Sequence, residues 1–276
     1  MTLKEIQAVA LDILKDVHQF CVAHDIHYTL FAGTLIGAIR HQGFIPWDDD
    51  VDVAMPRKDY DRFVSNYQSE NGYQLFCRER HGKDVYISHG RVCDMTRTFD
   101  DDAGMPWMRM KKKGVWIDIF PLDGAEPVRE QAEDKCREIM TVWKQTVTMR
   151  FHHARLSSRK GIWQKGRLLV RHLISPMDQR VWARHLALCK AIPFEQASCY
   201  SQYAWPGLGM REYYRTSAFD HYQLHPFEDG VFYVIGDYDG ALRAKYGDYM
   251  QLPPEEERLP IHSHANAYYW LPGCYE

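Results

Sequence analysis

The sequence lacks a closely spaced pair of cysteines. Its seven cysteines are odd in number, scattered over 276 residues, and none forms a CxxC motif. This pattern argues against a zinc knuckle and against a disulfide framework. Reduced thiols are the simplest account of it, and we therefore predict a cytoplasmic protein.

The sequence also lacks long apolar runs and an excess of positive charge. Lys4, Glu5 and Asp12 interrupt the apolar positions of the first helix-like segment, so we expect no signal peptide, and no later run is long enough to span a bilayer. The net charge is −3 and the pI is near 6.5, which predicts no nucleic-acid partner. We expect at most a peripheral contact with the inner face of a membrane.

Alternating helical and extended patterns fill the N-terminal half. Apolar residues at helical spacing and a Thr2…Glu5 capping box predict a first helix over residues 3–20. An extended stretch then leads to a Gly33-Thr34 turn and a short helix over 35–39. Pro56 introduces a further helix, because proline suits the first turn.

Later segments predict further strands. Residues 73–80 and 85–99 alternate well enough for strands, and 114–124 reads as a short apolar strand stopped by Pro121 and Gly124. A strand at 231–235 precedes a helix that we expect to begin after Asp237 and end at Gly247. The expected fold is α+β, a mixed sheet with several helices.

Three regions differ in composition. We predict a catalytic core over residues 1–125, a helical insert or subdomain over 126–199, and an aromatic-rich region over 200–276 that completes the core and the substrate site. The insert has long charged and apolar helical patterns and no strand signal of note.

An acidic cluster is the most informative local feature. Four aspartates occupy the five positions from Asp48 to Asp52, just before the apolar residues of DVDVAM. In a strand over 48–55, Asp48, Asp50 and Asp52 would share one face and repel one another unless cations neutralised them. An isolated DDD is more often a solvated loop. However, a further carboxylate, Asp118, lies among large apolar residues in WIDIF, where it would be costly without a partner.

These carboxylates predict a metal site. Oxygen ligands suit Mg²⁺ or Mn²⁺, and neighbouring strands carrying Asp50, Asp52 and Asp118 could hold two ions about 3.5 to 4 Å apart, an arrangement suited to phosphoryl transfer. We predict Asp48, Asp50, Asp52 and Asp118 as metal ligands, and Asp50, Asp52 and Asp118 as catalytic. The backbone N–H groups of Gly33 and Thr34 would cradle a phosphate.

Three segments resemble a known family: AGTLIGAIRHQGFIPWDDDVDVAMPRKDYDRF, WIDIFPLDG and YGDYMQLPPEEERLPIHSH. They are similar to the LicD family of the nucleotidyltransferase fold, whose members transfer phosphocholine to bacterial surface glycans, and more distantly to fukutin and fukutin-related protein. The resemblance covers the first ~125 and last ~50 residues. It implies that Asp48, Asp50 and Asp52 form the metal-binding segment and that Asp118 is the third carboxylate.

Several basic and aromatic residues are candidates for substrate contacts. Arg40, His41, Arg57 and Arg91 could contact the donor phosphates or nucleotide, although Arg57 could instead pair with Asp59, Asp61 or the acidic cluster. A quaternary ammonium group binds against aromatic faces, so Trp47 and Trp116 are candidates, although core packing is the commoner use of such side chains. His262 and His264 could contact substrate; a metal role is weaker because no third ligand is evident.

The sequence therefore predicts a metal-dependent phosphotransferase. By resemblance, it would move phosphocholine or a related phospho-alcohol from a CDP-activated donor to a sugar hydroxyl of a teichoic acid or lipopolysaccharide, and CMP would leave. The acceptor could be lipid-linked at the inner membrane face. One alternative is a nucleotidyltransferase that moves NMP to a small acceptor, and another is a non-catalytic glycan-binding protein on the same scaffold.

Overall fold

The computed structural model describes residues 1–85, 87–101, 113–157, 179–259 and 268–274. The main helices are α1 (Leu3–Ala23), α2 (Ala32–His41), α3 (Arg57–Asn66), α4 (Arg78–His81), α5 (Arg129–Ser157) and α7 (Tyr238–Tyr246); residues 179–189 are also helical. The strands are β1 (Thr29–Leu30), β2 (Asp52–Pro56), β3 (Tyr73–Phe76), β4 (Gly90–Asp94), β5 (Thr98–Asp100), β6 (Trp116–Ala125), β7 (Cys199–Ser201), β8 (Tyr214–Arg215), β9 (Tyr222–Phe227), β10 (Gly230–Ile235) and β11 (Tyr268–Trp270). A 3₁₀ helix, η3 (Pro206–Glu212), precedes β8.

One mixed sheet organises the described residues. Its order is β1-β2-β6-β4-β3, and β7 and β8 extend it from the far end of β6. The β2–β6 pair is parallel, and the other pairs of this sheet are antiparallel. The predicted α+β class is confirmed.

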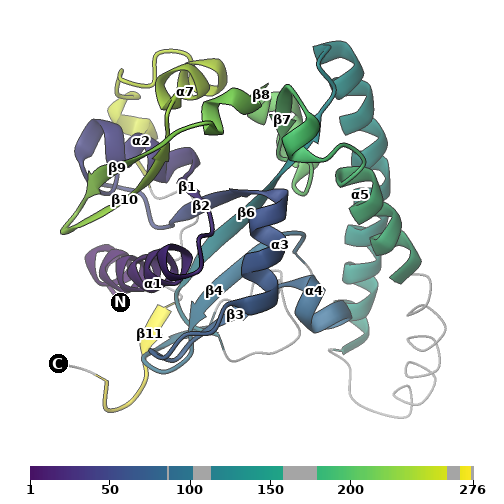
Figure 1. The fold of residues 1–276 in the computed structure, drawn as a ribbon. Coiled ribbons are helices and arrows are strands. Elements are labelled where there is room, and N and C mark those ends of the chain that lie inside the picture. Colours follow the sequence, from purple (N-terminus) through teal and green to yellow (C-terminus); the bar gives the residue numbers. More distant parts are fainter. Residues whose placement is uncertain (86, 102–112, 158–178, 260–267, 275–276) are drawn as a thin grey trace, which may run out of the picture.

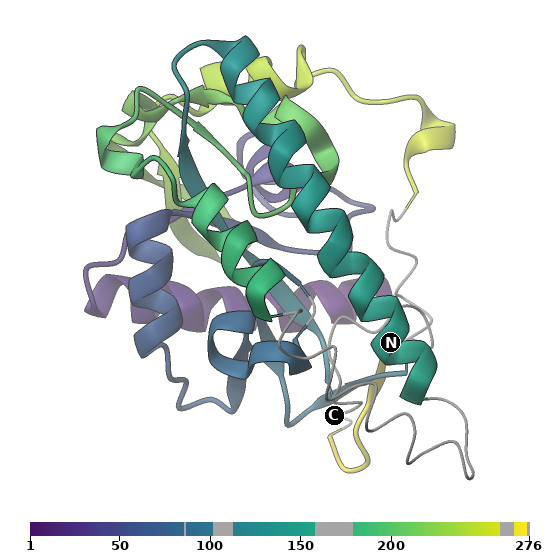
Figure 2. The ribbon, with the colours of Figure 1, turned by 90° about the vertical axis from the view of Figure 1, so that its right-hand side faces the viewer.

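Helices cover both sides of the sheet (Figures 1 and 2). Helix α1 crosses one side and buries Ile6, Ile13, Leu14 and Val17 in the largest hydrophobic cluster. Helix α5 runs along the other side, and residues 179–189 lie beside it (Figure 2). The predicted capping box is confirmed: the Glu5 N–H donates to Thr2 Oγ1, and the Thr2 N–H donates to Glu5 Oε2.

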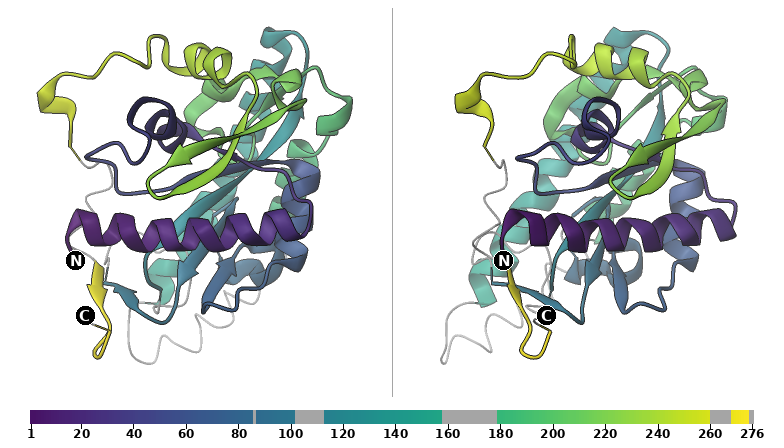
Figure 3. Two further views of the ribbon diagram at one scale, coloured as in Figure 1. Left: turned by 60° about the vertical axis from the view of Figure 1, so that its left-hand side comes forward. Right: turned by 90° about the vertical axis from the view of Figure 1, so that its left-hand side faces the viewer.

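The two ends of the described chain lie close together (Figure 3). The N-terminal ammonium group of Met1 donates to the Tyr268 carbonyl over 2.8 Å, and Trp270 Nε1 donates to Glu5 over 3.1 Å. Strand β11 pairs with β5, so the C-terminal strand is fixed beside the start of α1.

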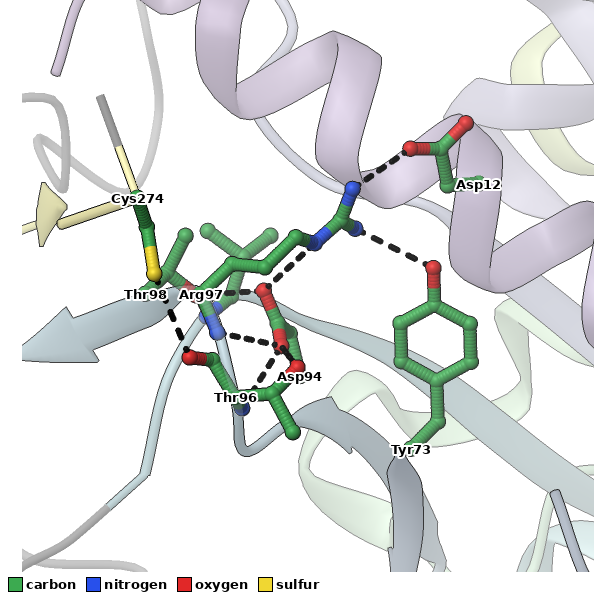
Figure 4. Close-up of polar contacts among 8 residues, drawn as sticks. Asp12, Tyr73, Asp94, Thr96, Arg97, Thr98 and Cys274 are labelled. Atoms are coloured by element: carbon green, nitrogen blue, oxygen red, sulfur yellow. Dashed lines mark hydrogen bonds and ion pairs between the residues drawn. The ribbon is translucent and has the colours of Figure 1, made fainter. Parts of the chain in front are cut away.

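A polar network holds the turn between β4 and β5 (Figure 4). The buried Asp94 carboxylate accepts from the N–H groups of Thr96 and Arg97 and from the Thr98 hydroxyl. The Arg97 guanidinium donates to Asp94, to Asp12 on α1 and to the Tyr73 hydroxyl on β3. Because its carboxylate is used within this turn, we assign Asp94 a structural role.

Strand β6 continues through Pro121 and ends at Ala125, so the predicted stop at Pro121 is wrong, whereas the end predicted at Gly124 is one residue early. The β4 ladder ends opposite Ile119 and the β7 ladder begins opposite Asp123. The Asp118 N–H points to β2, where it donates to the Val51 carbonyl, so with the two-residue period of a strand position 121 faces the gap between β4 and β7. The missing N–H of Pro121 therefore costs no ladder hydrogen bond.

Two further boundaries differ from the sequence predictions. Helix α2 begins at Ala32, so Gly33 and Thr34 belong to its first turn rather than to a preceding one. Strand β2 begins only at Asp52, so Asp48 and Asp50 lie in the loop before it. Among the described residues, no helix is both long enough and apolar enough to span a bilayer.

Candidate phosphoryl-transfer site

The acidic loop is held in place from two sides. The Gln7 side chain on α1 donates to the Asp48 carbonyl over 2.7 Å, and the Asp48 N–H donates to the Ile45 carbonyl over 2.9 Å. The Asp52 N–H donates to Thr34 Oγ1 over 2.8 Å. The backbone on both sides of Asp50 is therefore fixed against α1 and α2.

The first turn of α2 lies against the Asp48 carboxylate. A Cβ atom added at Gly33 would stand 2.8 Å from Asp48 Oδ2, so only glycine allows this approach. The preceding residue, Ala32, has a φ of 48°, a conformation that costs energy for a residue with a side chain. Free N–H groups at a helix start favour negative charge, which explains why a carboxylate can lie here.

Asp52 and Asp118 stand side by side on parallel strands, where they are register partners of β2 and β6. Burial raises the pKa of Asp52 well above its ordinary value, and the carboxylates of Asp50, Asp118 and Asp48 raise it further. Lys245 opposes this effect. The predicted electrostatic crowding of four carboxylates is therefore present in the fold.

Asp118 is paired with cationic and polar groups. Arg91 donates to both of its oxygens, over 2.6 and 3.3 Å, and His89 Nε2 lies 2.9 Å from Oδ1. Burial alone would raise the pKa of Asp118, but Arg91 and His89 outweigh it and lower that pKa. A carboxylate held in its ionised form this firmly is a weak proton acceptor.

The donor set fits a hard divalent cation. Asp48, Asp50 and Asp52 supply only carboxylate oxygens, and their mutual repulsion is the kind that a bound cation relieves. Within the described ranges, no three Asp, Glu, Cys or His side chains are already arranged so that they could hold a metal ion. The acidic loop would therefore need to draw its side chains together around an ion.

Lys245 on α7 completes the site from the opposite direction. Its ammonium group forms an ion pair with the buried Glu212 and lies over the rings of Phe31 and Tyr246, at 5.0 and 4.7 Å from their centroids. Burial lowers the pKa of Lys245 to about 8, although Asp52 favours its charged form. The ammonium group of Lys245 therefore acts on the acidic cluster.

The sequence analysis missed Lys245 and His89. His89 is two residues from Arg91, a spacing that places both on one side of an extended segment, and this signal could have been used. Lys245 lies 193 positions after Asp52 in the sequence, and no local pattern connects the two.

Several predicted contact residues have partners within the fold. Arg40 donates to the carbonyls of Tyr249 and Gln251 and to His41, and so connects α2 to the segment after α7. Arg57 is buried and donates to both oxygens of Asp123 over 2.7 and 2.8 Å, a partner that the sequence analysis did not consider.

Both aromatic candidates lie against cationic side chains. Trp116 is buried, and the cationic groups of Arg91 and Lys113 lie 4.5 and 5.0 Å from its ring centroid. Trp47 is half-buried, with the Arg258 guanidinium 5.8 Å from its ring. His262 and His264 lie outside the described residues.

Comparison with known proteins shows which family the chain resembles. The family described as LicD/FKTN/FKRP, nucleotidyltransferase domain, matches residues 25–156, which include the acidic loop, β2 and β6. The lipopolysaccharide cholinephosphotransferase LicD of Haemophilus influenzae is 32% identical over 271 residues, which are 95% of this chain and 96% of that protein.

A shorter match covers about a third of the chain. An uncharacterized protein of Rickettsia typhi is 36% identical over 92 residues, 33% of this chain and 29% of that protein. Because the Haemophilus protein is matched along nearly its whole length, the chain described here belongs to the LicD family.

Proposed function

We propose that this chain transfers phosphocholine from CDP-choline to a sugar hydroxyl of a bacterial surface glycan of the lipopolysaccharide type, and releases CMP. The observation that carries the proposal is the near full-length similarity to a lipopolysaccharide cholinephosphotransferase. The crowded carboxylates at the start of β2 supply a site for the chemistry.

Asp48, Asp50 and Asp52 would hold Mg²⁺ or Mn²⁺, with two ions as the working number. A bound divalent cation would neutralise charge on the diphosphate and favour departure of CMP. Through the cation that they hold, the loop acids would orient the diphosphate. The N–H groups at the start of α2 would donate to the diphosphate oxygens.

Arg91 and His89 hold the Asp118 carboxylate at a fixed place beside Asp52. We therefore propose that the catalytic role of Asp118 is to position the reacting groups as an ionised carboxylate and not to act as a base. The sugar hydroxyl attacks the phosphorus nearest choline, the bond from that phosphorus to the bridging oxygen breaks, CMP leaves with the electron pair, and the proton of the hydroxyl passes to solvent water.

Phosphorus NMR tests the reaction directly. Purified protein would be incubated with Mg²⁺, CDP-choline and a panel of amino-sugar-containing saccharides. We expect a new phosphodiester resonance together with CMP. Intact CDP-choline with every acceptor would refute choline as the transferred alcohol. CDP-glycerol, CDP-ribitol and nucleoside triphosphates would then be tried, and pyrophosphate release would indicate NMP transfer instead.

Asp50→Asn tests the acidic site. We expect turnover to fall at least about a thousandfold while the protein still folds. The substitution removes a carboxylate that would bind the metal ion and changes no residue of the buried core. Asp229→Asn is the matched control, since Asp229 is exposed and pairs only with Lys15 among the described residues. Full activity in Asp50→Asn would contradict the metal assignment and would agree with a non-catalytic binding role for the loop.

A further inference from the structure

A groove of about 490 Å³ includes Lys245, the residue that acts electrostatically on Asp52, in its lining. It is bounded by α5, η3 and α7, and its lining combines charged residues with the apolar side chains of Met140 and Met210. Four of its lining residues are cationic: Arg129, Arg137, Arg211 and Lys245. The one acidic residue of the lining is Glu133.

The positive charges of this groove are unequally neutralised. Arg129 pairs with Glu133, Arg137 with Asp134 and Lys245 with Glu212. Arg211 is exposed, and within the part of the chain that the structure describes no carboxylate forms an ion pair with it. Among the described residues, the Arg211 guanidinium is therefore the cationic group of this groove without an ion-pair partner.

Lys245 connects the groove to the acidic cluster. It lines the groove and is close enough to both Asp52 and Arg211 for each of them to act on its pKa. The neighbouring Tyr246 also lies within reach of Arg211 and of the acidic loop. Lys245 therefore shares the groove with Arg211 and also interacts electrostatically with Asp52.

A phosphate-bearing ligand fits this order of charges. A divalent cation on the acidic loop would attract one side of a phosphate group, and an ammonium and a guanidinium group would receive its other oxygens. The apolar side chains of Met140 and Met210 offer a surface for an uncharged part of the same ligand.

We propose that this groove binds a phosphate group of a substrate, with Arg211 and Lys245 as its ligands. The phosphate belongs either to the diphosphate of the nucleotide donor or to an anionic glycan acceptor. The inference rests on the proposed function for the identity of these substrates, whereas phosphate binding itself can be measured without turnover.

Arg211→Gln tests the groove, because an exposed arginine can be replaced without disturbing the core. We expect the KM of the phosphate-bearing substrate to rise about tenfold or more, the effect of losing a charge-assisted hydrogen bond, with a smaller change in kcat. Arg243→Gln is the matched control: Arg243 is exposed on α7, pairs with Asp239 and does not line the groove. Its KM values should equal those of the wild type.

The two substrates separate the possible sources of the phosphate. A rise in the KM of CDP-choline alone places the donor diphosphate in the groove, and a rise in the acceptor KM alone places an acceptor phosphate there. If Arg211→Gln and Arg243→Gln both match the wild type for both substrates, the groove proposal is overturned while the proposed function stands.

Binding of inorganic pyrophosphate in the presence of Mg²⁺ gives a readout that does not need turnover. If no CDP-alcohol is consumed, calorimetry should still show pyrophosphate binding that Arg211→Gln weakens about tenfold and Arg243→Gln leaves unchanged. That result would keep the groove and reject the proposed reaction. Equal affinity in all three proteins, or no binding to the wild type, would reject the groove.

Discussion

At the scale of single residues, the site depends on groups that share space and charge. Gly33 has no side chain, and the Asp48 carboxylate can therefore approach the start of α2. Arg91 and His89 keep Asp118 ionised between two strands. In each case one residue sets the position or the charge of a neighbouring carboxylate.

Gly33→Ala should reduce activity without reducing stability. The new Cβ would stand 2.8 Å from Asp48 Oδ2 and push the carboxylate aside. Misplacing a group of the site by about 1 Å costs about a hundredfold in rate. Alanine also favours a helix over glycine by up to about 1 kcal/mol, so the unfolding free energy should hold or rise. Turnover and urea denaturation of the same preparation measure the two effects.

Gly37→Ala is the companion variant from the same helix. Its Cβ would meet the Gly43 backbone carbonyl oxygen at 2.5 Å, and backbone cannot move aside as a side chain can. We expect a loss of about 1 to 3 kcal/mol in unfolding free energy, as for an overpacked core. If Gly33→Ala loses stability as Gly37→Ala does, the carboxylate contact is not what requires Gly33.

At the scale of elements, helices with local signals were predicted from the sequence and confirmed. Helix α1 has its Thr2–Glu5 capping box, and α7 begins after Asp237, whose side chain accepts from the Gly240 N–H, and ends at Gly247 with a φ of 69°. The signals for these boundaries lie within a few residues of each helix end, where capping chemistry acts.

The strands that carry the acids were predicted less accurately. The sequence predicted a strand over 48–55, but pairing partners exist only from Val51 and Asp52 onward. Pro121 suggested a stop because sequence alone does not show which flank of a strand lacks a neighbour. The contributions of Lys245 and Arg211 could not be predicted at all, because only the packing of α7 and η3 brings them to the site. The division at residues 125 and 199 stays a prediction.

The start of α3 is joined to the end of β6 by a buried ion pair. Arg57→Met should lower the unfolding free energy by about 3 to 5 kcal/mol, because it leaves the buried Asp123 carboxylate without its bidentate partner. Urea denaturation measures this loss. Lys58→Met, an exposed neighbour on the same helix, should change it by less than about 1 kcal/mol.

The double variant Arg57→Met/Asp123→Leu should recover most of the stability that Arg57→Met loses. Packed apolar side chains can replace a buried ion pair at little cost, whereas a lone buried charge cannot be accommodated. A double variant no more stable than Arg57→Met would show that the arginine stabilises the fold through other contacts, such as its approach to the Tyr60 ring.

At the scale of the whole molecule, metal binding should be visible as stability. A cation that binds only the folded state raises the unfolding free energy by about 2.7 kcal/mol at one hundred times its Kd, or several degrees in Tm for a chain of this size. Thermal melts with Mg²⁺, with Mn²⁺ and with EDTA should show this shift in the wild type.

Asp52→Asn should not show this metal-induced gain in stability. Without metal it should be as stable as the wild type or more so, because one of the crowded carboxylates is gone. It should gain little from either ion because a ligand is missing. An equal metal-induced shift in Asp52→Asn and the wild type would place the cation elsewhere on the molecule.

The parallel pairing of β2 with β6 has a consequence for how the protein becomes active during synthesis. Asp52 meets Asp118 only after the intervening chain has folded back, and Lys245 on α7 is translated 193 positions after Asp52. Such long-range contacts close slowly. A ribosome-bound chain would therefore have its acidic loop long before it had a working site, and the onset of activity would report the last stage of folding.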